Sequence, residues 1–223
     1  MNLRRDEDGK RRSIIDTCVR MNALGINQGT SGNISLRHGD GFLVTPTSLS
    51  YESLKAPDIV FVSMDGGALG RHRPSSEWRM HRAILTARSE IGCVLHVHSP
   101  YATILAIMER EIPPIHYMLA LAGGTVRCAP YATFGTEELS RHAVAALEGR
   151  MACLLAHHGM VALGKTAPDA LALAVEVEAL ARQYHGCLQI GNPPLLKEAE
   201  IRNVMRRFAQ SAYGPSGVGG NDT

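Results

Sequence analysis

Two pairs of predicted β-strands in this chain are joined by connections of only a few residues. Segments 34–37 (ISLR) and 42–45 (FLVT) are separated by HGDG, and segments 152–158 (ACLLAHH) and 160–164 (MVALG) flank a tight turn. A parallel crossover needs about a dozen residues or more, so each pair is expected to be antiparallel. Much of the sheet is therefore predicted to be antiparallel. This argues against a Rossmann fold, which needs short βαβ units throughout.

Helical patterns are interleaved with strands along the rest of the chain. Ser76 is predicted to cap a helix with Glu77 in its first turn, and Thr136 is predicted to cap another. The predicted helices span 11–25, 77–88, 100–108, 137–149, 168–190 and 198–211, and further strands are predicted at 58–62, 93–98 and 126–129. This order predicts an α/β fold in which helices cover both faces of one sheet.

The composition is that of one globular domain. The 223 residues are 45% hydrophobic and 20% charged, which is sufficient for a substantial core. A formal charge of +2 is too small to indicate nucleic-acid binding. The mixed charges of residues 4–12 are typical of a solvated N-terminus. Five widely spaced cysteines argue against a disulfide scaffold and favour the reducing cytoplasm. Residues 1–213 are expected to form the domain and 214–223 a flexible tail.

Two histidines interrupt the apolar segment 91–101, IGCVLHVHSPY. In a strand, His96 and His98 point to the same face about 7 Å apart, so they can converge on one cation. The alternative is a structural role, with each imidazole hydrogen-bonded to the backbone. His157 and His158 end another apolar strand and point to opposite faces, so at most one is expected to join the pair, and spacing does not choose between them. Three imidazoles with open positions are typical of a catalytic zinc site.

Three further segments have the residues of an anion-binding cradle. Gly32 lies in NQGTSGNIS, Thr47 in VTPTS, and Ser75 and Ser76 begin a predicted helix in PSSEWRMH. Free backbone amides, hydroxyls and a helix N-terminus all favour a phosphate. Taken alone, NQGTSGNIS is equally typical of a tight hairpin entry, PSSEWRMH is more typical of a helix cap, and VTPTS is more typical of a proline turn. Beside a metal centre, together they favour a phosphorylated substrate.

Seven motifs, in this order, resemble the zinc-dependent class II aldolase and adducin-head family, and most of all its aldolases of L-fuculose 1-phosphate. The motifs are NQGTSGNIS, VTPTSLSYESL, PSSEWRMH, VLHVHSPYAT, IPPIHYM, CAPYATFGT and LLAHHGM. The resemblance runs from about residue 13 to Tyr213, nearly the whole chain. It implies a three-layer α/β/α sandwich around a largely antiparallel central sheet, assembled as a C4 homotetramer with its sites between subunits.

The resemblance also implies roles for individual residues. The metal ligands fall on His96, His98 and His158, and the catalytic acid/base falls on Glu77. Tyr117 matches a tyrosine that reaches a neighbouring subunit's site, where it is expected to donate a proton to the aldehyde oxygen. The positions expected to bind substrate and its phosphate are Gly32, Asn33, Thr47, Ser48, Ser75, Ser76 and, on the C-terminal tail, Tyr213. Ser48 stands where the family's fuculose enzymes have glycine.

The activity implied by the resemblance is that of a class II aldehyde-lyase of carbohydrate metabolism. It would cleave L-fuculose 1-phosphate, or a 5-deoxy- or 5-methylthio-ribulose 1-phosphate, to dihydroxyacetone phosphate and a small aldehyde through a zinc-bound enediolate. Mn²⁺, Co²⁺ or Fe²⁺ are possible substitutes for Zn²⁺. The alternatives are a sugar-phosphate 4-epimerase, which usually has aspartate near the Glu77 position, and a methylthioribulose-1-phosphate dehydratase. Adducin heads keep the fold as binding modules, but they would be expected to lack the three histidines and Glu77.

Overall fold

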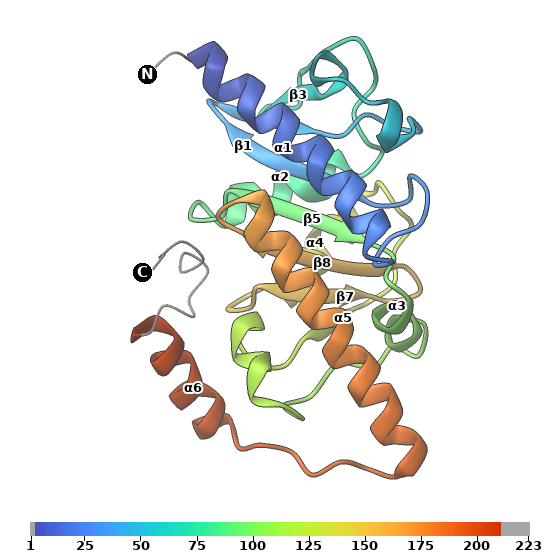
Figure 1. The fold of residues 1–223 in the computed structure, drawn as a ribbon, viewed down its shortest axis with the longest axis vertical. Helices are drawn as coiled ribbons and strands as arrows, with labels where there is room; N and C mark the ends of the chain where they lie inside the picture. Colours follow the sequence, from blue (N-terminus) through green and yellow to red (C-terminus); the bar gives the residue numbers. More distant parts are fainter. Residues whose placement is uncertain (1–2, 211–223) are drawn as a thin grey trace, which may run out of the picture.

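The computed structural model describes residues 3–210, in which one eight-stranded sheet is covered by helices (Figure 1). The strands lie in the order β4-β3-β2-β1-β5-β8-β7-β6. Their bounds are β1 Asn33–His38, β2 Gly41–Val44, β3 Val60–Ser63, β4 Ala68–Leu69, β5 Cys93–Val97, β6 Arg127–Ala129, β7 Ala152–Leu155 and β8 Gly159–Gly164. Only β6 and β7 pair in parallel among these strands. The predicted α/β fold with a largely antiparallel sheet is confirmed, and both predicted hairpins are present.

The helices divide between the two faces of the sheet. Their bounds are α1 Leu3–Ala23, α2 Trp78–Ala87, α3 Pro100–Ile107, α4 Glu137–Ala146, α5 Ala167–Ile190 and α6 Glu198–Gln210, with 3₁₀ turns η1 Tyr51–Ser53, η2 Ala56–Asp58 and η3 Tyr117–Ala122. Helices α1, α3 and α5 pack against one face, and α2 and α4 pack against the other (Figure 1). Along β5, Leu95 packs in the first core and Val94 in the second, as alternation along a strand requires.

Two helix starts differ from the sequence prediction. Helix α1 begins at Leu3, within the segment expected to be solvated, because ion pairs one turn apart support it: Asp6 lies 3.0 Å from Lys10, and Glu7 lies 2.6 Å from Arg11. Helix α2 begins at Trp78, so the prediction that Ser76 caps it is wrong.

The cap position of α2 belongs to Glu77, whose backbone has φ −98° and ψ 11°. Ser75 rather than Ser76 supports this turn, because its hydroxyl accepts from the Glu77 backbone N–H at 3.3 Å. The predicted Thr136 cap of α4 is confirmed, since its hydroxyl accepts from the Leu139 N–H at 3.2 Å.

No helix within residues 3–210 has the length and apolar character needed to cross a membrane. The five cysteines are free thiols, and three of them are buried. Tyr213 and the predicted tail lie outside the described residues.

Candidate metal centre and active site

Three imidazoles converge at the carboxyl end of β5. His96 and His98 point to the face that α2 covers, and His158 comes from the turn between β7 and β8. The Nε2 atoms of His96 and His98 lie 3.0 Å apart, and one nitrogen of each of the three rings lies within 4.8 Å of the others. The choice that spacing left open is decided by geometry: His158 lies in the cluster, whereas the neighbouring His157 is exposed.

The cluster has the geometry and protonation that a divalent metal requires. His96 Nδ1 lies 2.9 Å from the Met160 carbonyl oxygen, which only accepts, so Nδ1 holds the proton and the Nε2 lone pair faces the cluster. Tetrahedral zinc with bonds of about 2.05 Å separates its ligand nitrogens by about 3.3 Å, close to the 3.0 Å observed. Burial, followed by the charge of His158, lowers the pKa of both His96 and His98, which keeps them neutral. Neutral imidazole is the form that binds metal.

Glu77 is buried beside this cluster, with only 4% of its surface exposed. Its Oε2 lies 3.3 Å from His96 Nε2 and its Oε1 lies 3.5 Å from His158 Nε2. Because His96 is neutral, its contact with the carboxylate is not an ion pair. Oε1 has no hydrogen-bond partner among the described residues. An acceptor left free against a metal-binding cluster is placed to take or give a proton there.

The two loops expected to hold phosphate are tied together by the backbone. The Thr47 N–H donates to the Arg73 carbonyl at 3.1 Å, and the Ser75 N–H donates to the Thr45 carbonyl at 2.9 Å. Thr47 and Ser76 are exposed, whereas Ser75 is buried. The structure therefore brings the predicted phosphate-binding loops side by side next to Glu77.

Gly32 and Ser48 occupy backbone positions with special demands. A Cβ on Gly32 would lie 2.6 Å from the His96 carbonyl oxygen and 2.6 Å from Asn27 Oδ1, so no side chain fits there. Ser48 has φ +60°, in the left-handed region that favours glycine. The glycine expected at this position from the resemblance is the residue that this backbone conformation favours, and serine adopts it under strain.

The side chain of Asn33, a predicted phosphate-binding residue, contacts both Glu77 and His81. Its side-chain Nδ2 donates to Glu77 Oε2 at 2.9 Å, and its Oδ1 faces His81 Nε2 at 2.5 Å. Because an amide nitrogen has two N–H groups, the second is left for a ligand. His81 was missed by sequence reasoning, although its spacing from Glu77, four residues along a helix, places both on one helix face.

Tyr117 does not lie with the histidines of its own chain. It is on η3, which packs against α5 and α6, and its ring lies 4.7 Å from that of His116 and 6.5 Å from that of Phe208. The side chain is 48% exposed. Its expected role at a neighbouring subunit's site stays a prediction.

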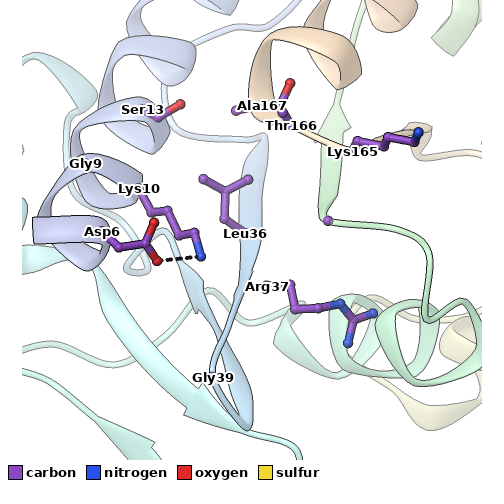
Figure 2. Close-up of a pocket in the computed structure, with 11 residues that line it drawn as sticks. Asp6, Gly9, Lys10, Ser13, Leu36, Arg37, Gly39, Lys165, Thr166 and Ala167 are labelled. Atoms are coloured by element: carbon purple, nitrogen blue, oxygen red, sulfur yellow. Dashed lines mark ion pairs between the residues drawn. The ribbon is translucent and has the colours of Figure 1, made fainter. Parts of the chain in front are cut away.

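A surface cavity of about 660 Å³ lies elsewhere, between α1, the far end of β1 and the start of α5 (Figure 2). Its cationic side chains do not converge on a ligand. Lys10 pairs with Asp6, the Arg37 guanidinium donates to three backbone carbonyls, and Figure 2 shows Lys165 extending away from the Asp6–Lys10 pair. The histidine cluster with Glu77 is therefore the candidate active site.

Comparisons with known proteins show which proteins this chain is similar to. The family model described as Class II Aldolase and Adducin N-terminal domain matches residues 12–185. A 5-methylthioribulose-1-phosphate/5-deoxyribulose-1-phosphate aldolase of Rhodospirillum rubrum is 52% identical over 199 residues, 89% of this chain and 90% of that protein. The L-fuculose phosphate aldolase of Escherichia coli K12 is 49% identical over 199 residues, 88% and 93% of the two chains. A solved L-fuculose 1-phosphate aldolase superposes with a TM-score of 0.88 at 34% identity, covering 90% of this chain and 96% of that one.

Proposed function

The chain belongs to the class II aldolase and adducin N-terminal domain family, and we propose that this aldolase reversibly cleaves a ketose 1-phosphate to dihydroxyacetone phosphate and a small aldehyde. The observation that carries the proposal is the Glu77 carboxylate beside a cluster of three converging imidazoles. A lyase of this kind needs a cation near the carbonyl and a base near the carbon that gains or loses a proton. Both requirements are met within one buried site.

The three histidines are the proposed metal ligands, with Zn²⁺ as the metal and Mn²⁺, Co²⁺ or Fe²⁺ as substitutes. When bound, the metal supplies a Lewis acid that polarises the substrate's oxygens and stabilises negative charge.

The protein's own groups move the protons. In cleavage, the C4 hydroxyl gives its proton to the phenol oxygen of a neighbouring subunit's Tyr117, the C3–C4 bond breaks, and the bonding electron pair stays on C3. Glu77 then delivers a proton to C3, which gives dihydroxyacetone phosphate; in the condensation direction Glu77 removes that proton. Oε1 is the atom free for this transfer. Tyr117 of a neighbouring subunit is the proposed acid for the aldehyde oxygen in condensation.

The phosphate is proposed to lie against the paired loops described above. Hydroxyls and backbone amides of Thr47, Ser48, Ser75 and Ser76 would bind it, together with the Gly32–Asn33 turn. Hydrogen bonds of this kind hold a phosphate by geometry and need no cluster of lysines. This suits a chain with a formal charge of only +2.

The substrates proposed are 5-deoxyribulose 1-phosphate, 5-methylthioribulose 1-phosphate and L-fuculose 1-phosphate. The first two appear in the name of the relative that is 52% identical. L-fuculose phosphate appears in the name of the relative that is 49% identical. The three differ only beyond C4. A methyl-sized difference in the departing aldehyde contributes about 1–3 kcal/mol of discrimination, so one enzyme can accept more than one of them.

The proposed assembly is a C4 homotetramer that acts in the cytoplasm. Large apolar side chains are exposed at the end of α3 and in the loop before α4, notably Met108 (61%) and Phe134 (63%). Tyr117, which lies away from its own histidine cluster, needs a neighbouring chain to act. Five free thiols suit a reducing compartment. Light scattering after gel filtration measures the number of subunits directly.

The experiment that tests the proposal is cleavage of the three ketose 1-phosphates by the purified protein, with dihydroxyacetone phosphate detected. We expect release before chelation, loss of release after chelation, and recovery when Zn²⁺ is restored. The relative kcat/KM values then identify the preferred substrate. If metal-loaded protein releases no dihydroxyacetone phosphate from any of them, the aldolase assignment fails and the epimerase and dehydratase readings are tested next.

Matched variants separate the chemistry from general damage. Glu77→Gln is expected to abolish cleavage while metal content is kept, and His158→Ala is expected to lower metal content. Glu90→Gln and His72→Ala replace the same residue types on the surface and are expected to leave both readouts unchanged.

A further inference from the structure

A second histidine environment lies directly behind Glu77, and the mechanism above does not use it. His81 is completely buried on the face of α2 that meets β1. Its Nδ1 lies 2.7 Å from Ser35 Oγ, and its Nε2 lies 2.5 Å from Asn33 Oδ1. Asn33 continues the chain of contacts, because its Nδ2 donates to Glu77 Oε2 at 2.9 Å. Four buried polar side chains therefore form one line that ends at the carboxylate.

The direction of every hydrogen bond in this line follows from the side chains themselves. An ionised carboxylate only accepts, so the Asn33 amide must turn its NH₂ to Glu77 and its oxygen to His81. That oxygen also only accepts, so His81 holds its proton on Nε2. Its Nδ1 is then an acceptor, and the Ser35 hydroxyl donates a hydrogen bond to it. Burial lowers the pKa of His81 to about 3, which keeps the ring neutral and compatible with this arrangement.

The arrangement is built by two regular elements that cross. On β1, Asn33 and Ser35 are two residues apart and point to the same face. Glu77 is the N-terminal cap residue of α2, and His81 lies four residues further on, within the helix, where its backbone N–H donates to the Glu77 carbonyl at 3.4 Å. Three of the four residues therefore belong to a strand or a helix, and the fourth, Glu77, is the residue that caps the helix. Sites held by such elements are positioned more closely than sites held by loops.

We propose that His81 is a positioning residue that orients the Asn33 amide so that Asn33 holds Glu77 Oε2 and leaves Oε1 free for the substrate proton. The inference rests on the proposed function, in which Glu77 transfers the C3 proton. His81 touches neither the substrate nor the metal cluster in this account. It acts on Glu77 only through Asn33.

Without His81 the amide of Asn33 has no fixed orientation. If the amide turned over, its oxygen would face the carboxylate oxygen and its NH₂ would face the Nε2–H, so both contacts would be repulsive. His81 prevents this because Ser35 fixes its tautomer. Outer residues that orient a functional group in this way typically change activity by about 10- to 100-fold when they are replaced.

Two amide substitutions of similar polarity test the proposal at the protein's own metal loading. His81→Gln keeps an N–H donor near the position of Nε2 and so reaches Asn33. His81→Asn is shorter and reaches only Ser35. Each is also made in the Asn33→Ala background, with Glu77→Gln as a reference and His38→Asn as a control at the far end of β1. The readouts are kcat and KM for ketose 1-phosphate cleavage, metal content and melting temperature.

The proposal predicts that His81→Asn lowers kcat about 10- to 100-fold with KM within about 3-fold, and that His81→Gln retains kcat within about 5-fold. In the Asn33→Ala background, neither His81 substitution lowers kcat further, because the route to Glu77 is already removed. If His81 had a purely structural role, its substitutions would lower the melting temperature instead. Any fold-loss in kcat that they caused would then multiply with the fold-loss caused by Asn33→Ala.

Three outcomes overturn the proposal. One is a folded His81→Asn protein with the kcat of the unmodified chain, and another is losses that multiply in the double variants. If His81→Asn does not fold, a further loss from His81→Gln in the Asn33→Ala background overturns it equally. The reference separates the two levels of the account: an active Glu77→Gln protein refutes the proposed function as well. An inactive one with silent His81 variants refutes only the positioning role.

Discussion

A single added methyl group at Gly159 is predicted to disable the metal centre. Gly159 follows His158 directly and begins β8, which pairs with β5. A Cβ on it would lie 2.5 Å from the Val97 carbonyl oxygen and 3.0 Å from His98 Cδ2. It would also lie 3.3 Å from His96 Cε1. Alanine therefore pushes on a β5 backbone carbonyl and on two of the proposed ligands.

The size of the effect follows from these distances. Real Cβ contacts are essentially never under 3.0 Å, so β8 and β5 must separate by about 0.5 Å at this point. Functional groups need to be held within about 0.5 Å of their productive geometry, so a displacement of this size is as large as the positional error that a metal site tolerates. We expect Gly159→Ala to lower metal affinity about 10- to 100-fold. The strain is expected to lower the free energy of unfolding by about 1–3 kcal/mol.

The assay is competition for Zn²⁺ with a chromogenic chelator, together with urea unfolding of the metal-free protein. Gly186→Ala is the matched control, because Gly186 lies within α5 and a Cβ there meets nothing within 4 Å. This control is expected to keep metal affinity and to gain about 0.5–1 kcal/mol from better helix propensity. A Gly159→Ala protein with unchanged zinc affinity would refute the claim that the β8 start positions the ligands.

Three further predictions concern stability. Because the pKa of His81 in the folded protein is about 3 and its ordinary value is 6.5, the unfolded chain binds more protons between these values, so stability is full above pH 6.5 and falls as pH drops. When the pH is lowered from 7.5 to 5, the free energy of unfolding measured in urea is therefore expected to fall by about 2 kcal/mol less for His81→Gln than for the unmodified chain. An equal fall in both proteins would contradict the burial argument. Ser48→Gly is expected to raise the melting temperature because φ is +60°, whereas Ser50→Gly, at φ −61°, is expected to lower it. Glu178→Ala is expected to cost about 1–3 kcal/mol, since its carboxylate accepts from the Tyr101 and Ala102 N–H groups at the start of α3, and Glu176→Ala serves as its control in the same unfolding experiment.

The sequence contains enough local information to predict most of the fold. Hairpin connections of a few residues required antiparallel neighbours, and apolar periodicity located the helices and the principal strands. Helix starts were less predictable, because several capping residues compete within a few positions. Any of Ser75, Ser76 and Glu77 could occupy the cap position of α2. The structure places Glu77 there, with a hydrogen bond from its backbone N–H to Ser75 Oγ, and this bond depends on a fold that the local sequence does not specify.

The site was predictable where it depends on periodicity and was not where it depends on close approach. His96 and His98 share a face because strand side chains alternate. The choice of His158 depends on how the β7–β8 turn folds, which spacing does not specify. Gly159 and Gly32 matter because other chain segments pass within 3 Å of a would-be Cβ, and nothing local in the sequence reports such an approach. His81 is part of the site because α2 packs where its side chain reaches Asn33 and Ser35 of β1, and the sequence does not specify that packing.

Exchange of the C3 proton of dihydroxyacetone phosphate with solvent tests the central claim most directly, because it isolates the step assigned to Glu77 and needs no aldehyde. The metal-loaded protein and its Glu77→Gln variant are incubated with dihydroxyacetone phosphate in D₂O, and loss of one C3 hydrogen signal is followed by NMR. We predict stereospecific exchange by the unmodified protein, none after chelation, and none by Glu77→Gln with its metal retained. Exchange at an unchanged rate in the Glu77→Gln protein would contradict the account.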